Sequence, residues 1–404
     1  MKSTRLEGHF PVIGGLQLSP AGLVVAAALL AVSIYFLFGG LASSWATGSG
    51  LMNEGGLAVG RDFTMFWSAS LLTLEGNAAS VYDFNLIREV QGMLTGVPDP
   101  AYPVWLYPPT GLLLVAPVSL LPYEIALVLW SVAGAAALGA VLWKILRDPA
   151  VVALLMVFPA VSLCLINGQS GLFLAALLGG GLVFLDQRPW LAGVLLGTAT
   201  VKPQLLLLVV PCLLLGRHWR ALAGLGGAFL VLAILSVGAF GAGTWTAFLD
   251  HVIGGVNILE QVRPLERMPS VFVASSLAGM SRDAAAALQV AVAVLMLVIV
   301  GRLWLRRSPI AIRGSALLFA APLVTPYSFD YDLSVLTVAL AWLAVEVCRR
   351  GWLSGEKVLV ALLWVSPIAG WLIALRTGLL LTPLVLLACV WGVARAARTE
   401  AAVS

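Results

Sequence analysis

The stretch that decides the fold is residues 190–216, WLAGVLLGTATVKPQLLLLVVPCLLLG, in which Lys202 is the one charged side chain. A helix needs about 20 apolar residues to span a bilayer, and a proline inside a helix breaks it. Pro203 therefore divides this run into two helices of about 13 residues, each only about 20 Å long. We expect a hairpin whose tip, with Lys202, lies below the membrane surface and is surrounded by protein or a water-filled cavity.

The same apolar character extends along the whole chain. Of its 404 residues, 61% are hydrophobic and 10% are charged, whereas a soluble domain carries roughly 25% charged residues. Other apolar runs lie at about 20–40, 124–146, 149–165, 171–186, 221–240, 283–304, 314–325, 331–348, 357–375 and 379–398, with a shorter piece at 107–121. The sequence predicts an all-α polytopic membrane protein, one domain over residues 1–404, with about 11 to 13 transmembrane helices.

The N-terminal run allows two interpretations. Residues 20–40 follow Lys2 and Arg5, and the small residues at 42–44 would suit a signal-peptide cleavage site. The run is longer than the apolar region of a typical signal peptide, so an uncleaved span is favoured.

The distribution of positive charge predicts the orientation, because cytoplasmic loops are enriched in Lys and Arg. With both termini in the cytoplasm and a hairpin at 190–216, 16 of the 23 Lys and Arg residues fall on the cytoplasmic side and 7 on the other. This arrangement, in an inner (plasma) membrane, requires residues 107–121 to dip in and return. The net charge of +4 does not indicate a nucleic-acid partner, because the cations occur in short clusters between apolar runs.

Two outward segments, 41–107 and 241–282, are longer than turns require, and long loops in compact proteins are usually functional or disordered. Both are rich in aromatic residues and proline, which argues against disorder. Amphipathic pieces at 61–74 and 78–94 suit helices at the headgroup level. We expect a structured cap on the outer face.

Polar residues near the membrane surface are the candidates for chemistry, because ionisable groups there are costly and tend to be functional. Asp62, next to Arg61 and followed by Trp67, could be a buried general base. A solvated surface pair is the usual interpretation of an isolated Arg–Asp, but the position after the first span favours the base. Tyr107, before two prolines, is best explained as a rigid helix start.

Three further clusters follow. Asn167 and Gln169 flank a glycine in what could be a plain turn, or could present an amide to sugar hydroxyls, and the two interpretations stay open. Lys202 with Gln204 suits a phosphate, with a snorkelling lysine as the alternative. The turn at 325–332 carries Tyr327, Asp330 and Asp332; two carboxylates fall short of a metal cage, so sugar or lysine contacts are expected and no metal or cofactor.

The order of these clusters resembles glycosyltransferase family 87 from about residue 55 to 345. The resemblance is carried by Asp62, Trp67, Tyr82-Asp83, Tyr107-Pro108-Pro109, Leu121-Pro122, Asn167-Gly168-Gln169, Lys202-Pro203-Gln204 and the Pro326–Asp332 turn. Members are polytopic GT-C-fold enzymes that take a sugar from a polyprenyl-phosphate donor on the outer leaflet, and the best known are mannosyltransferases.

The resemblance implies that Asp62 is the catalytic base and that Lys202, with Arg263 and Arg267 of the later outer loop, serves the lipid phosphate. The expected reaction is an inverting transfer of a sugar, such as a hexose like mannose, to a glycolipid or glycan of the cell envelope. No sugar-specific signature separates hexose from pentose.

Two other classes compete with a transferase. A lipid or glycan transporter or flippase would also use broken helices and a midmembrane lysine, but no internal repeat is evident between the two halves. A non-catalytic scaffold or lipid-binding subunit is the third class. Neither explains a long, aromatic outer loop that carries an aspartate.

Overall fold

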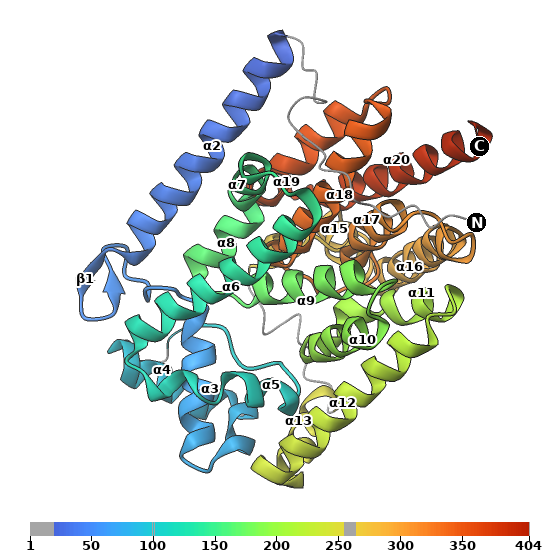
Figure 1. Ribbon diagram of the computed structural model, residues 1–404. Helices are drawn as coiled ribbons and strands as arrows, with labels where there is room; N and C mark the ends of the chain where they lie inside the picture. Colours follow the sequence, from blue (N-terminus) through green and yellow to red (C-terminus); the bar gives the residue numbers. More distant parts are fainter. Residues whose placement is uncertain (1–19, 99, 101, 254–263, 404) are drawn as a thin grey trace.

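The computed structural model describes residues 20–98, 100, 102–253 and 264–403. This part of the chain is almost entirely helical, and its strands are β1 (Thr47–Ser49) and β2 (Met52–Asn53), which pair antiparallel as a small hairpin (Figure 1). The predicted fold class, an all-α polytopic membrane protein, is confirmed.

Six helices of the described residues are long and apolar enough to cross a membrane. They are α2 (Pro20–Trp45), α6 (Tyr123–Leu146), α12 (Trp219–Phe240), α16 (Arg282–Leu305), α19 (Glu356–Thr377), and α18 (Leu336–Arg350) with the 3₁₀ turn η7 (Asp330–Val335) before it. The predicted span at 149–165 is a pair, α7 (Pro149–Met156) and α8 (Pro159–Asn167), bent by 60°, which raises the number to seven. The sequence-based number of 11 to 13 is not reached by length alone.

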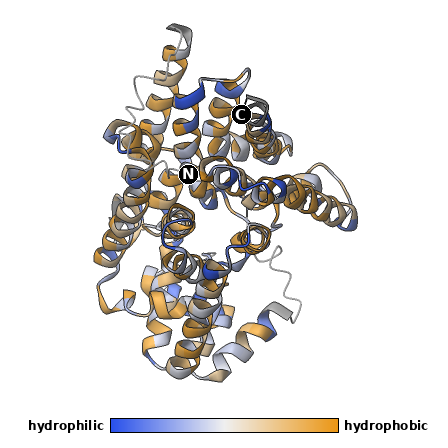
Figure 2. Cartoon of the chain, turned by 45° about the vertical axis from the view of Figure 1, so that its right-hand side comes forward, coloured by the Kyte–Doolittle hydropathy of each residue, from blue (hydrophilic) through white to orange (hydrophobic). Residues whose placement is uncertain are grey.

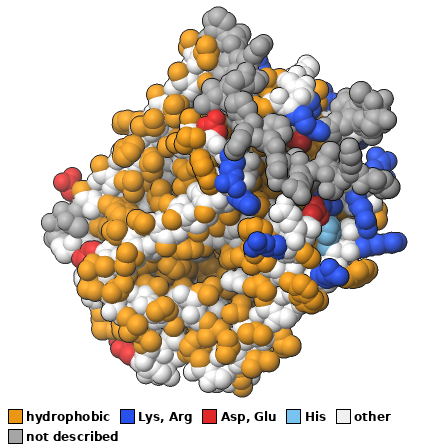
Figure 3. Space-filling model, in the orientation of Figure 1, with side chains coloured by type: hydrophobic (Ala, Val, Ile, Leu, Met, Phe, Trp, Pro, Cys, Tyr) orange, Lys and Arg blue, Asp and Glu red, His pale blue; other side chains and the backbone are white. Residues whose placement is uncertain are grey.

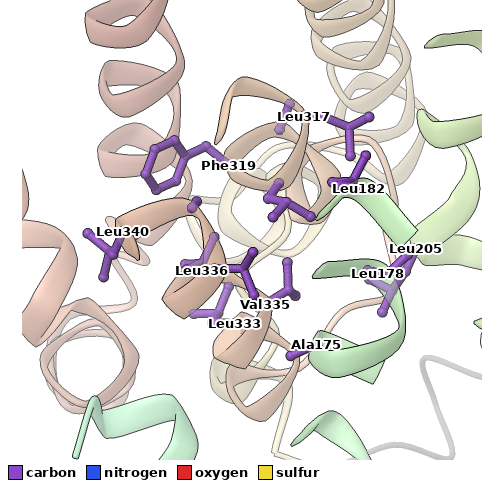
Figure 4. Close-up of a cluster of buried hydrophobic side chains, with 14 of the residues drawn as sticks. Ala175, Leu178, Leu182, Leu205, Leu317, Phe319, Leu333, Val335, Leu336 and Leu340 are labelled. Carbon is purple, nitrogen blue, oxygen red and sulfur yellow. The ribbon is translucent and has the colours of Figure 1, made fainter. Parts of the chain in front are cut away.

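The predicted number of spans is larger because the sequence-based prediction also included short apolar helices inside the bundle. These are α9 (Gly171–Phe184), α10 (Pro189–Thr198), α11 (Val209–Leu215) and α17 (Ile310–Ala320). At 1.5 Å per residue, the 14 residues of α9 reach about 21 Å, less than a bilayer core of about 30 Å. Their leucines pack with those of η7 and α18 in a dry cluster, seen in Figure 4 between Leu178, Leu317 and Leu336.

The long helices present apolar side chains outward. Leu23, Tyr35, Val132, Ile234 and Val290 are all exposed, as expected for a surface that faces lipid. Figure 2 shows these helices coloured mainly as hydrophobic, and Figure 3 shows the lower part of one face of the molecule covered by hydrophobic side chains.

The inner helices connect two ends of the molecule. At the first end, called the cap end, Gly168 before α9 packs on Leu127 near the start of α6. Gly179, farther along α9, packs on Val141 near the end of α6, so the two helices run parallel. Both finish at the far end, where the Lys144 ammonium lies 6.0 Å from the Phe184 ring.

The segment 190–216 is a hairpin with its tip toward the cap end. Asp186, just before α10, and Gly216, just after α11, line the same cavity, so the segment leaves and returns at the far end. Between α10 and α11 the chain forms two 3₁₀ turns, η3 (Ala199–Val201) and η4 (Pro203–Leu206), on either side of Lys202. Breaking the helix at Pro203 is the expected effect of a proline that cannot donate a backbone hydrogen bond.

Glycines let α10 lie directly against α12. A Cβ at Gly193 would collide with the Ala221 carbonyl oxygen, and one at Gly197 would lie 2.6 Å from the Leu225 carbonyl oxygen. Small residues at such an interface allow close backbone approach, which drives helix association in lipid.

The cap has a core of its own, formed by residues such as Phe63, Phe66 and Trp105. It consists of α3 (Phe63–Leu74), η1 (Ala78–Tyr82), α4 (Phe84–Thr95), α5 (Pro109–Val115), η2 (Val118–Leu120) and α13 (Ala242–Ile253). The seven residues of α5 reach about 10 Å, and the Ser70 hydroxyl of α3 donates to the Ala116 carbonyl at 2.7 Å. Residues 107–121 therefore stay with the cap and do not cross.

The rest of the described chain completes the bundle. η5 (Leu265–Arg267) and α15 (Val271–Leu277) precede α16, and α20 (Thr382–Val403) ends the chain. An arginine with positive φ lies shortly after the end of each of three helices. These are Arg147 (54°) after α6, Arg217 (56°) after α11 and Arg307 (51°) after α16.

Candidate functional site

Two glycine turns position Asp62. Gly60 and Gly168 both adopt positive φ, 59° and 68°, and both pack against Leu127. A Cβ at Gly168 would lie 2.6 Å from the Cβ of Phe63. Since glycine alone tolerates both the backbone angle and the close approach, these turns bring the start of α3 against the loop between α8 and α9.

Asp62 is held from that loop by two contacts. Its backbone N–H donates to the Asn167 carbonyl at 3.0 Å, and its carboxylate Oδ2 accepts from Gln169 Nε2 at 3.0 Å. The residue is 3% exposed and precedes α3 without making a side-chain cap bond. The carboxylate therefore has one oxygen fixed by an amide and remains able to accept a proton or a hydroxyl hydrogen bond.

Lys202 lies in a buried ion pair with Asp332. The ammonium is 2.6 Å from Asp332 Oδ1, and Asp332 Oδ2 accepts the backbone N–H of Phe329 at 2.9 Å. The ammonium also lies 5.0 Å from the centre of the Tyr331 ring, a cation–π distance. Hydrogen bonds and a ring face together compensate for the cost of burying this charge.

A second ion pair lies beside it on the same turn. Arg267 Nε and Nη2 donate to the two carboxylate oxygens of Asp330 at 2.7 and 2.9 Å. Burial lowers the pKa of the Arg267 guanidinium, but the adjacent Asp330 more than offsets this, so the net shift is upward and the group stays cationic. This fork-to-carboxylate geometry fixes the orientation of Arg267.

Tyr107 links the aspartate to the lysine. Its hydroxyl shares a 2.9 Å hydrogen bond with Ser170 Oγ, and the Lys202 ammonium lies 5.9 Å from the centre of its ring. Burial raises the pKa of the Tyr107 hydroxyl, and the charges that act on it include those of Lys202, Asp332 and Asp62. The backbone N–H of Ser170 also donates to Gln169 Oε1 at 3.3 Å, and Gln169 holds Asp62. A continuous chain of contacts at the cap end therefore joins the carboxylate to the ammonium.

Tyr327 belongs to the same neighbourhood. Burial raises the pKa of its hydroxyl, followed by the effects of Tyr107, Asp332 and Asp62, so the phenol stays neutral. Its ring meets Phe329 edge-on at 5.7 Å. Neutral phenols and aromatic rings are common lining groups of small-molecule sites.

The remaining predicted site residues lie as follows. Arg61 and Gln204 are half-buried, Gln204 on η4 two residues after Lys202. Asn167 acts through its backbone carbonyl, while its side-chain amide donates to Leu163. Arg263 lies outside the described residues.

The structure does not bring Trp67 into this group. Its indole N–H donates to the Leu121 carbonyl at 3.2 Å, and its ring meets Tyr123 edge-on. At 3.6 residues per turn, a residue five positions after Asp62 points to a different face of α3. Trp67 fixes α3 to the start of α6.

The expected lysine contact of the 325–332 turn is present, as Lys202–Asp332. Sequence reasoning missed Ser170, the pairing of Arg267 with Asp330, and the bond between Asp62 and Gln169. Lys202 and Asp332 are 130 residues apart, and Asp62 and Gln169 are 107 apart. Asp330 and Asp332 are each engaged by a cation, and among the described residues no group of three His, Cys, Asp or Glu side chains is arranged to hold a metal.

Comparison with known proteins gives one finding. The family model described as glycosyltransferase family 87 matches residues 105–326. No curated protein and no solved structure matches the chain. The matched stretch contains Tyr107, Gln169, Lys202 and Arg267, and Asp62 joins it through the hydrogen bond from Gln169.

Proposed function

This chain belongs to glycosyltransferase family 87, and from that premise we propose that it moves a sugar from a polyprenyl-phosphate donor to a glycolipid or glycan acceptor with inversion. The family makes it a membrane glycosyltransferase; donor, acceptor and mechanism are the proposal. Asp62 is the general base, and Lys202 and Arg267 serve the donor phosphate.

One observation supports this assignment above all. A carboxylate that accepts a neutral amide bond, at Asp62, lies in the same polar site as a buried cation, Lys202, and a half-buried one, Arg267. A transferase of this kind needs a proton acceptor on one side of the anomeric carbon and positive charge on the other.

The reaction follows from these groups. Asp62 removes the proton of an acceptor hydroxyl while that oxygen forms a bond to the anomeric carbon. The bond from this carbon to the phosphate oxygen breaks, and polyprenyl phosphate leaves with the electron pair. Attack opposite the leaving group inverts the configuration, and the proton remains on Asp62 until solvent takes it. General base assistance contributes about 10² to 10⁴ in rate.

The cations can serve the phosphate without leaving their partners. An ammonium has three donors, and Asp332 uses one of those of Lys202. Arg267 uses two N–H groups on Asp330 and keeps others for a ligand. Fixed cations in a water-poor site stabilise a departing anion effectively, because they need no reorganisation during the reaction.

The membrane orientation is also part of the proposal. The far end carries Lys144, Arg217 and Arg307, which the positive-inside bias places in the cytoplasm. The cap end and its site then face the extracytoplasmic side of the plasma membrane. Transport is the less supported alternative, because the leucine cluster around Leu178, Leu317 and Leu336 separates the two ends of the inner helices.

The decisive experiment compares Asp62→Asn with the wild type in proteoliposomes that contain a polyprenyl-phosphate mannose donor and extracted envelope glycolipid acceptors. We expect transfer to fall by about 10² to 10⁴, because the base is lost while the shape is kept. Asp283→Asn, an exposed residue in the first turn of α16, is the matched control and should keep full activity. Transfer by Asp62→Asn at the wild-type rate would overturn the assignment of the base.

The donor role has its own test. Lys202→Gln should weaken the binding of the polyprenyl-phosphate donor, measured by donor titration. Donor affinity equal to that of the wild type would remove Lys202 from the phosphate site and leave the role of Asp62 intact.

A further inference from the structure

A second polar cavity, of about 380 Å³, opens at the far end of the inner helices. It is formed where three turns meet, those between α9 and α10, between α11 and α12, and between α16 and α17. Its lining residues are Asp186, Gly216, Arg217, His218, Arg307, Ser308, Pro309, Ile310 and Arg313. Three arginines against one aspartate make it strongly cationic among the described residues that line it.

Arg313 is the most buried of the three arginines that line this cavity. The residue is 4% exposed, and its guanidinium carbon lies 5.0 Å from the centre of the Trp304 ring. Nη2 donates to both oxygens of Asp186 at 2.8 and 2.9 Å, but the buried Nε of Arg313 has no hydrogen-bond partner. A buried charged donor without a partner is costly, so this group points to a missing acceptor.

His218 adds a second donor or acceptor of the same kind. Its Nε2 is buried and also lacks a hydrogen-bond partner, while its ring meets Trp304 edge-on at 5.7 Å. His218 directly precedes α12, and Pro309 directly precedes α17. The N-termini of two helices, of 22 and 11 residues, therefore open at the cavity and favour an anion there.

The surroundings of the cavity are those of a membrane boundary. Trp219, which follows His218, and Leu305, two residues before Arg307, are 60% and 59% exposed. Figure 3 shows Lys and Arg side chains gathered at the upper right of the molecule, the region where Figure 1 labels α11, α16 and α17. The 14 residues of α9 separate this cavity from the site at the cap end by about 20 Å.

We propose that the far-end cavity binds a phosphate group whose negative charge is not compensated within the ligand, separately from the transferase site. Arg217, Arg307 and Arg313 neutralise the phosphate, and the free nitrogens of Arg313 and His218 provide hydrogen bonds to its oxygens. Two sources share this chemistry, an anionic lipid headgroup and free inorganic phosphate, and the exposed apolar rim favours the lipid.

The test uses the full-length protein in neutral detergent micelles and native mass spectrometry to measure bound phosphatidylglycerol and phosphatidic acid, with phosphatidylcholine as the zwitterionic probe. A double variant, Arg217→Gly with Arg307→Gly, removes two guanidinium groups at positions where positive φ suits glycine, so the fold is kept. We expect its affinity for the anionic lipids to fall roughly 10- to 100-fold, because the two arginines are exposed and water partly screens their attraction to the phosphate.

The matched control is Arg302→Gln with Arg306→Gln, which removes two exposed charges of the same helix end that do not line the cavity. It should bind the anionic lipids as the wild type does. Equal losses in the two double variants would reduce the effect to general surface charge and overturn the proposal, as would equal binding of phosphatidylcholine. A parallel titration with inorganic phosphate distinguishes the two sources. Saturable phosphate binding that is lost in the glycine variant would identify free phosphate as the ligand. Binding of the anionic lipids without binding of inorganic phosphate would identify the lipid headgroup as the ligand.

Discussion

The two ends of α9 both carry charged side chains, but they balance charge differently. At the cap end, each buried cation has its own carboxylate, as Lys202 has Asp332 at 2.6 Å. At the far end, the one aspartate of the cavity, Asp186, is 54% exposed and faces three arginines. We call the cap end the closed end, because its charges cancel within ion pairs. We call the far end the open end, because its cavity has more positive than negative charge and its aspartate is exposed.

This difference shows which task each end can perform. Paired charges are held in one geometry, which suits a site where a reacting sugar must be positioned to within a fraction of an ångström. Unpaired cations attract an anion but hold it with less directional control. The dry leucine cluster between the ends keeps the two environments apart.

The largest effect on stability should come from removing the cation of the buried ion pair at the closed end. Lys202→Met leaves the Asp332 carboxylate buried without a cation, and the free energy of unfolding should fall by about 3 to 5 kcal/mol. Asp186→Asn at the open end should lower it by less, because the half-exposed side chain keeps an amide oxygen that accepts from the buried Arg313 guanidinium. Denaturant unfolding in micelles measures both. Adding Asp332→Leu to Lys202→Met should restore part of the loss; a double variant no more stable than the single one would contradict the ion-pair explanation.

The next effect concerns the turn that brings Asp62 to Gln169. Gly168→Ala should lower the free energy of unfolding by about 2 to 4 kcal/mol, because the methyl group would clash with Phe63 and the alanine would also be strained at positive φ. Gly96→Ala, at φ 74° with open space around it, is the control and should cost about 1 kcal/mol. Thermal unfolding compares them, and equal losses would mean that packing at Gly168 is unimportant.

A smaller effect should appear in catalysis. Gln169→Leu removes the amide bond to Asp62, and kcat should fall roughly 10- to 100-fold, the equivalent of about 1.5 to 3 kcal/mol for a hydrogen bond to a charged group. Gln91→Leu removes another buried amide of the cap, which donates to Pro103 at 2.8 Å. That control should lower stability and leave kcat unchanged. The same kcat loss in both variants would attribute the effect to the cap as a whole.

The smallest effect is a pH dependence at the open end. Burial, with the nearby Arg313, lowers the pKa of His218. As pH falls below about 6.5, the unfolded chain binds this proton more readily than the folded one, so stability decreases with acidity. Between pH 7 and 5 the wild type should therefore lose more stability than His218→Gln, measured by thermal unfolding. An equal loss of stability between pH 7 and 5 in the two proteins would show that His218 does not contribute to the pH dependence.

Much of the architecture follows from the sequence. Pro203 and the length of its flanking runs predict the hairpin that carries Lys202, and the structure has it. The number of spans was harder to predict, since a helix surrounded by other helices is as apolar all round as one that faces lipid. Hydropathy alone cannot tell the 14-residue α9 from a crossing helix.

The site was predicted as a set of residues but not as a set of contacts. The turn with Gln169 and the aspartate at position 62 were singled out, yet nothing local in the sequence indicates that they bond across 107 residues. Trp67 shows the opposite error, because closeness in sequence to Asp62 does not give closeness in space when helical geometry turns the side chain away.

The three arginines with positive φ have a consequence for biosynthesis. Arg147, Arg217 and Arg307 follow helices that finish at the far end, where glycine would adopt the same backbone angle without the cost of about 1 kcal/mol. Glycine would carry no charge, and a nascent helix is oriented during insertion by the positive residues at its ends. With the far end in the cytoplasm, as proposed, the local strain at these positions accompanies positive charge that favours this orientation.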